Sequence, residues 1–361
     1  VQYIADEVPS VVEFANVDEK EVFEEINRSI KPFDLSKAPL MRVKFISVSD
    51  VKHYAVIDMH HIISDQSSID ILLQEFTMIY KGEKLPKNEV RYIDFAAWQN
   101  QLFKKGLIEK QIDYWMKELS GEIPVLDMYT DFQAPQGITH KGKILHFSVD
   151  KDNSLKINQF AKELRITPYM LMMASLKLLL YKYSGQKDLI IGTAVAGRNH
   201  LSLNTVVGMF VNLLPIRSQI DESLSVKEYL GYIKDKMVAA FENQDCQFDM
   251  IVEKLNMDKG SQDNPLFNVV INYVNMGTEE LEIENLTLTP WLPEVVDTKY
   301  NIHVTILEKD NVFDIDVEYS IELFKEESME LFGKRFVNMV NYLVEHQDSL
   351  LSEISLVTPE E

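Results

Sequence analysis

The chain has 361 residues, of which 46% are hydrophobic and 26% charged, a composition typical of a globular protein large enough for two hydrophobic cores. Its 36 basic and 57 acidic residues give a formal net charge of −21, which would repel phosphate backbones and anionic lipid. We therefore expect neither nucleic acid nor membranes as partners.

The compartment is predicted from cysteine usage and apolar runs. Cys246 has no second cysteine to pair with, so no disulfide requires an oxidising environment. The mostly apolar run at residues 170–180 is about half of the roughly 20 residues that a membrane span needs. Val1 opens a segment without the features of a signal peptide, and we interpret it as a cut inside a larger protein. The expected localisation is cytoplasmic.

Strands are predicted where apolar and polar residues alternate. This pattern of half-buried strands occurs at residues 41–48, 53–59, 142–149 and 312–319. The apolar run at residues 189–195 predicts a fully buried strand.

Helices are predicted where apolar residues recur at three- and four-residue spacings. Such spacings occur at residues 68–81 and 331–344. A further helix is expected to begin after Thr167, with Pro168 in its first turn, and to stop at Gly185. Because helices and strands do not alternate strictly, we expect an α+β fold of mixed sheets with helices.

Residues 120–141 mark the best candidate for a boundary between two subdomains. This segment is rich in Gly, Pro and Asp and has no sustained period. We therefore predict an N-terminal subdomain at residues 1–122 and a C-terminal subdomain at residues 123–361. The short acidic stretch at residues 279–284 predicts a solvated loop or a strand edge.

Two adjacent histidines, His60 and His61, follow the predicted strand at residues 53–59 and are the main candidates for chemistry. An imidazole can accept or donate a proton near neutral pH. If the strand continues through them, the two side chains face opposite ways, so only one points into a given cleft. Asp65, four residues after His61, could fix the surroundings of the imidazole or cap the following helix.

The histidine pair also has other interpretations. An adjacent pair taken alone is more often structural than catalytic. Metal binding is disfavoured because no HExxH motif or paired cysteines accompany it. The glycines Gly192, Gly197 and Gly208 lack the spacing of a phosphate-binding loop, so no nucleotide site is expected either.

The segment HHIISD at residues 60–65 resembles the HHxxxD core of the condensation domains of nonribosomal peptide synthetases, in the chloramphenicol acetyltransferase-like superfamily. Further stretches resemble this family's signatures in the right order. They are residues 32–36 with 39–42, 92–98, 197–199, 207–212 with Arg217, 243–245 with 248–249, and 264–267. Taken alone, residues 92–98 predict helix packing, residues 207–212 a strand with a glycine bend, and Asn264-Pro265 a turn.

The resemblance implies two chloramphenicol acetyltransferase-like subdomains that form a V-shaped pseudo-dimer with a central channel. It implies an acyltransferase that joins a donor acyl or peptidyl thioester to the α-amine of an acceptor aminoacyl thioester. Both thioesters would be carried on phosphopantetheine arms, so the chain itself would bind no cofactor. The product would be an amide bond, as in the biosynthesis of peptide antibiotics and other secondary metabolites.

The same resemblance assigns roles to particular residues. His61 is expected to be the catalytic residue, as a base or by positioning the amine, and His60 to support it. Asp65 is expected to pair with Arg198 and so to tie the two subdomains together. Candidates for lining the channel or binding substrate are Ser67, Asn212 and Asn268.

The chain departs from the family pattern in two respects. Gln66 stands where a glycine usually follows the aspartate, and its side chain could narrow the channel or add a hydrogen-bond donor. The two earliest family motifs are absent, so the N-terminal subdomain is expected to be incomplete. The expected partners are an upstream donor and a downstream acceptor carrier domain, with an adenylation domain following Glu361.

Three other functions remain open. They are a coenzyme A-dependent acyltransferase, an epimerisation domain, and a noncatalytic module that docks carrier domains. Gln66 is the chief support for the noncatalytic module, and the intact His61 argues against it.

Overall fold

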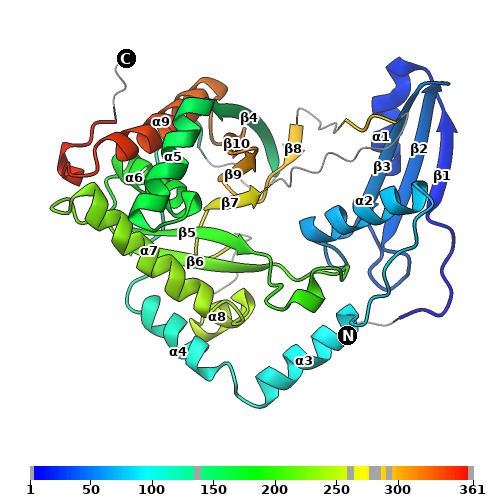
Figure 1. The fold of residues 1–361 in the computed structure, drawn as a ribbon, viewed down its shortest axis with the longest axis horizontal. Helices are drawn as coiled ribbons and strands as arrows, with labels where there is room; N and C mark the ends of the chain where they lie inside the picture. The colour runs from blue at the N-terminus through cyan, green and yellow to red at the C-terminus, as the bar shows by residue number, and fades with distance from the viewer. Residues whose placement is uncertain (1–3, 134–139, 258–263, 276–285, 290–294, 357–361) are drawn as a thin grey trace. The chain divides into compact units, whose positions relative to one another are not determined.

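A computed structural model describes residues 4–133, 140–257, 264–275, 286–289 and 295–356 (Figure 1). Contacts divide the chain into two compact units. Unit 1 consists of Val1–Asn100 with Arg198–Val211, and unit 2 of Gln101–Gly197 with Asn212–Glu361. This division falls after Asn100, and the subdomain boundary expected at residue 122 stays a prediction. The acidic stretch at residues 279–284 lies outside the described residues.

Unit 1 is built around a three-stranded sheet in the order β1-β2-β3. Its strands are β1 (Val12–Asn16), β2 (Met41–Ser49) and β3 (Lys52–Met59), with β1 parallel and β3 antiparallel to β2. Ile46 on β2 is fully buried in a small core with Val22 and Ile26 of α1 (Val22–Ser29). The chain then forms α2 (Gln66–Tyr80) and α3 (Tyr92–Lys104), of which the part up to Asn100 belongs to unit 1.

Unit 2 holds a seven-stranded sheet in the order β6-β5-β7-β9-β10-β4-β8. Its strands are β4 (Lys141–Val149), β5 (Asp188–Val195), β6 (Asn212–Gln219), β7 (Val269–Asn275), β8 (Val295–Asp297), β9 (Ile302–Lys309) and β10 (Val312–Ser320). Its helices are α4 (Glu109–Glu118), α5 (Lys151–Leu164), α6 (Pro168–Ser184), α7 (Val226–Glu242), α8 (Phe248–Lys254) and α9 (Glu326–Glu345). Figure 1 shows α5, α6 and α9 gathered beside the β4, β10 and β9 part of the sheet.

Helix α6 forms where its capping residues predict. The Thr167 hydroxyl accepts a hydrogen bond from the backbone N–H of Met170, Pro168 opens the helix, and Gly185 closes it at a φ of 71°. A positive φ is available to glycine at little cost, so the helix stops there. Its residues from Met170 to Tyr181 are all buried, which places it at the centre of the unit 2 core.

The structure contains the predicted strands and helices with shifted ends, but the strand predicted at residues 207–212 is wrong. The expected helix at residues 68–81 is α2, which begins two residues earlier, and that at residues 331–344 is part of α9. Residues 207–211 form no strand, and β6 begins at Asn212. The reason is that the backbone N–H groups of Gly208 and Phe210 donate to side chains of unit 1 and not to a neighbouring strand.

Candidate active site

The two histidines lie in a turn that begins where β3 ends. β3 stops at Met59, and the N–H of Ile63 donates to the carbonyl of His60 at 3.1 Å. Because the strand does not continue through His60 and His61, strand alternation does not set the directions of their side chains. The hydrogen bonds of the two rings distinguish them instead.

The His61 ring is held through its Nδ1 atom, which lies 2.6 Å from the backbone carbonyl oxygen of Ser64. A carbonyl oxygen can only accept, so Nδ1 carries the proton. In the neutral imidazole, Nε2 then bears the lone pair. His61 is exposed, while Ser64, which holds it, is 5% exposed. The arrangement presents a proton acceptor on an ordered turn.

The His60 ring takes the opposite tautomer. Its Nδ1 accepts a hydrogen bond of 3.0 Å from the backbone N–H of Ile62, so in the neutral ring the proton sits on Nε2. The ring packs at right angles to the ring of Phe33, with ring centroids 6.2 Å apart. His60 is therefore a packed neighbour that stabilises the turn, and it offers a donor rather than an acceptor at Nε2.

Asp65 caps helix α2 and is saturated with hydrogen bonds. Its Oδ1 accepts from the backbone N–H of Ser68 at 2.8 Å and from the Ser68 hydroxyl at 2.7 Å, and its Oδ2 accepts from the N–H of Phe210 at 3.1 Å. Its side chain is 1% exposed. A carboxylate so placed anchors the turn that carries His61 and is not accessible for proton transfer.

Arg198 pairs with Asp65, as predicted. Its Nη2 lies 2.9 Å from Oδ1, and its own side chain is 6% exposed. The guanidinium also donates to the carbonyls of Leu203 and Val206 and stacks over the Phe210 ring at 4.1 Å. Residues 198–211 belong to compact unit 1 together with Asp65, and the expected role of the pair in tying the subdomains 1–122 and 123–361 together stays a prediction.

Ser68 is a site residue that the sequence reasoning missed. Its hydroxyl is fully buried and contacts the Asp65 carboxylate, the carbonyl of Gly208 at 2.8 Å and the N–H of Gly208 at 3.0 Å. Its place three residues after a helix-capping aspartate was a signal for a contact to Asp65. Nothing local indicated Gly208, which is 140 positions away.

Tyr92 closes the same cluster. Its hydroxyl donates to the carbonyl of Met209 at 2.8 Å, and its ring packs against Phe210 with centroids 5.1 Å apart. Burial raises the pKa of Tyr92, and the nearby charge of Asp65 adds to the rise. A Cβ on Gly208 would come within 2.2 Å of the Tyr92 ring, so the close approach requires glycine.

Gln66 and Ser67 begin helix α2 outside this cluster. Gln66 is exposed, and its amide nitrogen lies 3.1 Å from the Asp70 carboxylate one turn further on. Its side chain therefore lies along the helix surface. Ser67 is partly exposed. The roles expected for both in the channel stay predictions.

The two candidates in unit 2 differ in their hydrogen bonding. The Asn212 amide donates to the carbonyls of Gln244 and Cys246 at 2.8 and 2.9 Å and accepts from the N–H groups of Leu213 and Phe248 at 2.9 and 3.0 Å. All its hydrogen-bonding positions are thus used to join β6 to the start of α8.

Asn268 keeps an unused acceptor. Its Nδ2 donates to the carbonyl of Leu126 at 3.2 Å, whereas its buried Oδ1 has no partner among the described residues. Its role in substrate binding stays a prediction.

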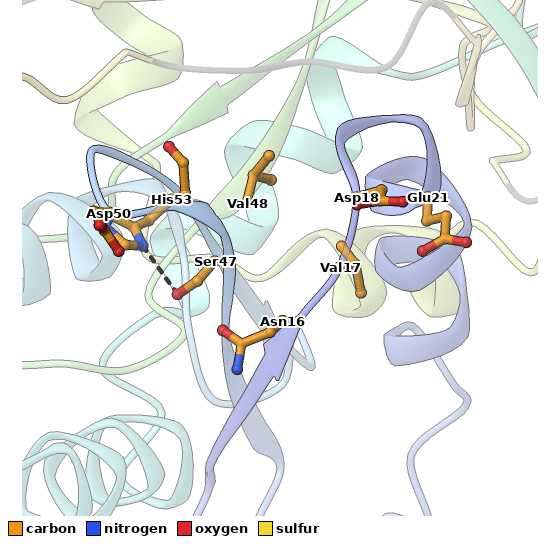
Figure 2. A pocket seen from close by; sticks show the side chains of 9 residues that line it. Asn16, Val17, Asp18, Glu21, Ser47, Val48, Asp50 and His53 are labelled. Carbon is orange, nitrogen blue, oxygen red and sulfur yellow. Dashed lines mark hydrogen bonds between the residues drawn. The ribbon is translucent and has the colours of Figure 1, made fainter.

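A hollow of about 620 Å³ in unit 1 lies away from the histidine turn (Figure 2). Its lining includes Asp18, Glu21, Asp50 and His53, and His53 stands at the start of β3. The histidine turn follows the other end of that strand. None of the predicted site residues lines the hollow.

In the described part of the chain, no group of three or more His, Cys, Asp or Glu side chains is suited to a metal ion, and no helix is long and apolar enough to cross a membrane.

The family model of the condensation domain matches residues 1–361. Bacitracin synthase 3 of Bacillus licheniformis is 36% identical over 361 residues, which cover 100% of this chain and 6% of that protein. Gramicidin S synthase 2 of Brevibacillus brevis is 36% identical over 363 residues, which cover 100% of this chain and 8% of that protein. The chain belongs to the condensation-domain family of nonribosomal peptide synthetases, and it spans less than a tenth of these two relatives.

Solved structures of the same fold include the X-domain in complex with OxyB from teicoplanin biosynthesis, with a TM-score of 0.86, 19% identity, and coverage of 99% of this chain and 82% of that one. The condensation domain of Monacolin K polyketide synthase MokA matches with a TM-score of 0.81, 19% identity, and coverage of 94% and 80%. The predicted α+β, chloramphenicol acetyltransferase-like fold is thereby confirmed. In this family the phosphopantetheine arm is carried by partner domains.

Proposed function

We propose that the chain catalyses amide-bond formation between two carrier-bound thioesters, with His61 as the residue that handles the proton. The observation that supports this is the 2.6 Å contact between His61 Nδ1 and the Ser64 carbonyl, which leaves Nε2 as the acceptor on an exposed ring. Membership of the condensation-domain family supports amide-bond formation as the type of reaction, and the hydrogen bonding of the histidine turn supports His61 as the residue that handles the proton.

In the proposed reaction, the acceptor α-amine attacks the donor thioester carbonyl and forms a C–N bond. The tetrahedral intermediate then collapses, the C–S bond breaks, and the sulfur leaves as the thiolate of the donor phosphopantetheine. The proton lost by the amine nitrogen passes to His61 Nε2 and then to that sulfur, so charge and atoms balance. The extended chain remains on the acceptor arm.

Both proton transfer and positioning are within the capacity of one oriented imidazole. A general base contributes about 10² to 10⁴-fold in rate, and good alignment of reactants can supply roughly 7 to 11 kcal/mol of the barrier. An α-amine has a pKa of about 8, so a useful fraction is neutral at about pH 7. Orientation of the ring by the Ser64 carbonyl serves both roles.

The partners follow from the same proposal. The thioesters would arrive on an upstream donor and a downstream acceptor carrier domain, with an adenylation domain in the same synthetase. The curated relatives are synthetases more than ten times the length of this chain, which is consistent with such an arrangement.

The test is single-turnover condensation by the full-length protein, supplied with donor and acceptor carriers loaded with a panel of proteinogenic amino acids. His61→Ala is expected to lower the rate of dipeptidyl product by about 10² to 10⁴-fold. His53→Ala is the matched control, since His53 is also exposed and hydrogen-bonded to a serine, Ser47, at 3.0 Å. Equal rates for His61→Ala and wild type would overturn the proposal.

The same experiment separates the other functions. Carrier binding without any amide product would indicate a docking module. Product formed from acyl coenzyme A without carriers would indicate a coenzyme A-dependent acyltransferase. Inversion of the donor residue without a new amide bond would indicate epimerisation.

A further inference from the structure

A chain of polar side chains crosses four neighbouring strands of the unit 2 sheet. The strands are β5, β7, β9 and β10, and the side chains are Asn272 on β7, His303 on β9 and Glu318 on β10. The Asn272 amide joins this chain to the backbone of Ala194 on β5. All belong to unit 2.

The donor and the acceptor of each hydrogen bond can be assigned by starting from the backbone N–H of Ala194. The N–H of Ala194 donates to Asn272 Oδ1 at 2.9 Å, which fixes which end of the amide is oxygen. Asn272 Nδ2 is then the donor to His303 Nε2 at 2.9 Å. The neutral His303 ring therefore carries its proton on Nδ1, which lies 3.6 Å from Glu318 Oε2.

Glu318 is kept ionised beside this ring. Burial by itself raises its pKa, but hydrogen bonds from His303 and Thr298 outweigh burial and leave the pKa below its ordinary value. The side chains of His303 and Glu318 are 22% and 21% exposed. A charged carboxylate and an oriented imidazole thus hold the Asn272 amide in one position.

These hydrogen-bonded side chains lie on the sheet face that is partly exposed. On β9, Ile302, Val304 and Ile306 are fully buried, so the alternate residues His303 and Thr305 point to the other face. Thr305 is the register partner of Asn272 on the adjacent strand. The two polar side chains therefore stand side by side.

These two side chains retain hydrogen-bond donors. Asn272 Nδ2 has two hydrogens and uses one on His303. The Thr305 hydroxyl lies 3.5 Å from His303 Nε2, whose one lone pair already accepts from Asn272. Within the described residues no other acceptor is found for either donor.

The charge of the face selects the kind of acceptor that could bind. Asp314, Asp316 and Glu318 alternate along β10 and so share one face. Their carboxylates disfavour a phosphate or carboxylate ligand by like-charge repulsion. A neutral carbonyl oxygen has two lone pairs, matches two adjacent donors and carries no charge.

We propose that Asn272 and Thr305 bind the acyl carbonyl oxygen of a thioester substrate, and that His303 and Glu318 act as positioning residues for the Asn272 amide. This inference rests on the proposed function, because it assumes that a thioester is the substrate. It requires no covalent step from these residues.

The test uses two probes that differ in one carbonyl. Acetyl-pantetheine carries the acyl oxygen, and S-ethylpantetheine has the same length without it. Calorimetric titration of each into the full-length protein, without any acceptor amine, measures binding apart from turnover. Wild type is expected to bind acetyl-pantetheine more tightly; equal affinity for the two probes would overturn the inference.

Variants of Asn272 and Thr305 test whether these two donors cause the preference for acetyl-pantetheine. Asn272→Leu and Thr305→Val are each expected to weaken acetyl-pantetheine binding by roughly 3- to 10-fold, as for loss of one neutral hydrogen bond, and to leave S-ethylpantetheine unchanged. Thr305→Ser keeps the hydroxyl and should bind as wild type does. If both probes weaken equally, the donors recognise an amide of the pantetheine arm, and the acyl assignment is wrong.

The positioning role has its own readout. His303→Gln retains an acceptor for the Asn272 amide and should preserve the preference for acetyl-pantetheine, whereas His303→Leu should reduce it. If both variants behave alike, His303 does not position Asn272. His61→Ala should leave the preference intact, so failure of the His61 rate test and failure of this binding test are distinguishable.

Discussion

Asp65 and Arg198 face each other at 2.9 Å inside unit 1, although 133 positions separate them in the sequence. Arg198→Met would leave the Asp65 carboxylate buried without its cation, and we expect a loss of about 3 to 5 kcal/mol in the free energy of unfolding, measured by urea denaturation. The control is Lys52→Met, which breaks the exposed pair with Glu19 and should change stability little. Equal effects of the two substitutions would contradict the structural role of Asp65.

The opposite hydrogen bonds of His60 and His61 predict opposite neutral tautomers. Two-bond ¹H–¹⁵N correlation spectra should show His61 protonated on Nδ1, because Nδ1 faces the Ser64 carbonyl, and His60 protonated on Nε2, because its Nδ1 accepts from Ile62. Spectra of His61→Ala and His60→Ala assign the signals. A His61 ring protonated on Nε2 would remove the acceptor that the proposed mechanism requires.

Gly208 is expected to tolerate no side chain. Gly208→Ala would bring a Cβ within 2.2 Å of the half-buried Tyr92 ring, and overpacking of this kind costs about 1 to 3 kcal/mol. The matched control is Gly231→Ala in α7, where nothing lies within 4 Å of the new Cβ and a small gain in stability is expected. Differential scanning calorimetry compares the two, and a Gly208→Ala variant as stable as Gly231→Ala would contradict the contact.

The buried Lys177 is expected to make the free energy of unfolding depend on pH. It is fully buried in α6, where its ammonium donates to the carbonyl of Ile216 at 2.7 Å. Burial lowers the pKa of Lys177 to about 7 from an ordinary 10.5; the charge of Asp188 opposes this shift, and the charge of Lys236 reinforces it. Between these two values the unfolded chain binds more protons than the folded one, so the free energy of unfolding rises with pH in that window and is flat below it.

Lys177→Met should abolish this rise. Replacing buried ionic groups by apolar ones of similar volume often stabilises by about 1 to 4 kcal/mol, so the variant should exceed wild type most clearly below pH 7. Urea denaturation at pH 6, 8 and 10 measures both proteins, with the exposed Lys156→Met as control. If the free energy of unfolding of wild type does not rise relative to that of Lys177→Met between pH 7 and 10, the lowered pKa of Lys177 is refuted.

Much of the secondary structure was readable from local patterns. The helix bounded by Thr167 and Gly185 was predicted at both ends, because capping and a left-handed stop depend on residues within one turn of each other. Asp65 was predicted as a helix cap on the same grounds, and it is one. The segment at residues 207–211 failed as a strand because its N–H groups bond to side chains that no local pattern reveals.

By itself, the sequence determined the histidine pair, the capping aspartate after it and the family to which the motif points, since these features need only neighbours along the chain. Tertiary structure alone decided which ring of the pair carries an acceptor, because the answer depends on the path of the turn after Met59. It also decided that Ser68, Gly208 and Phe210 complete the Asp65–Arg198 cluster. Burying that ion pair requires donors from distant segments, and only the folded chain brings them together.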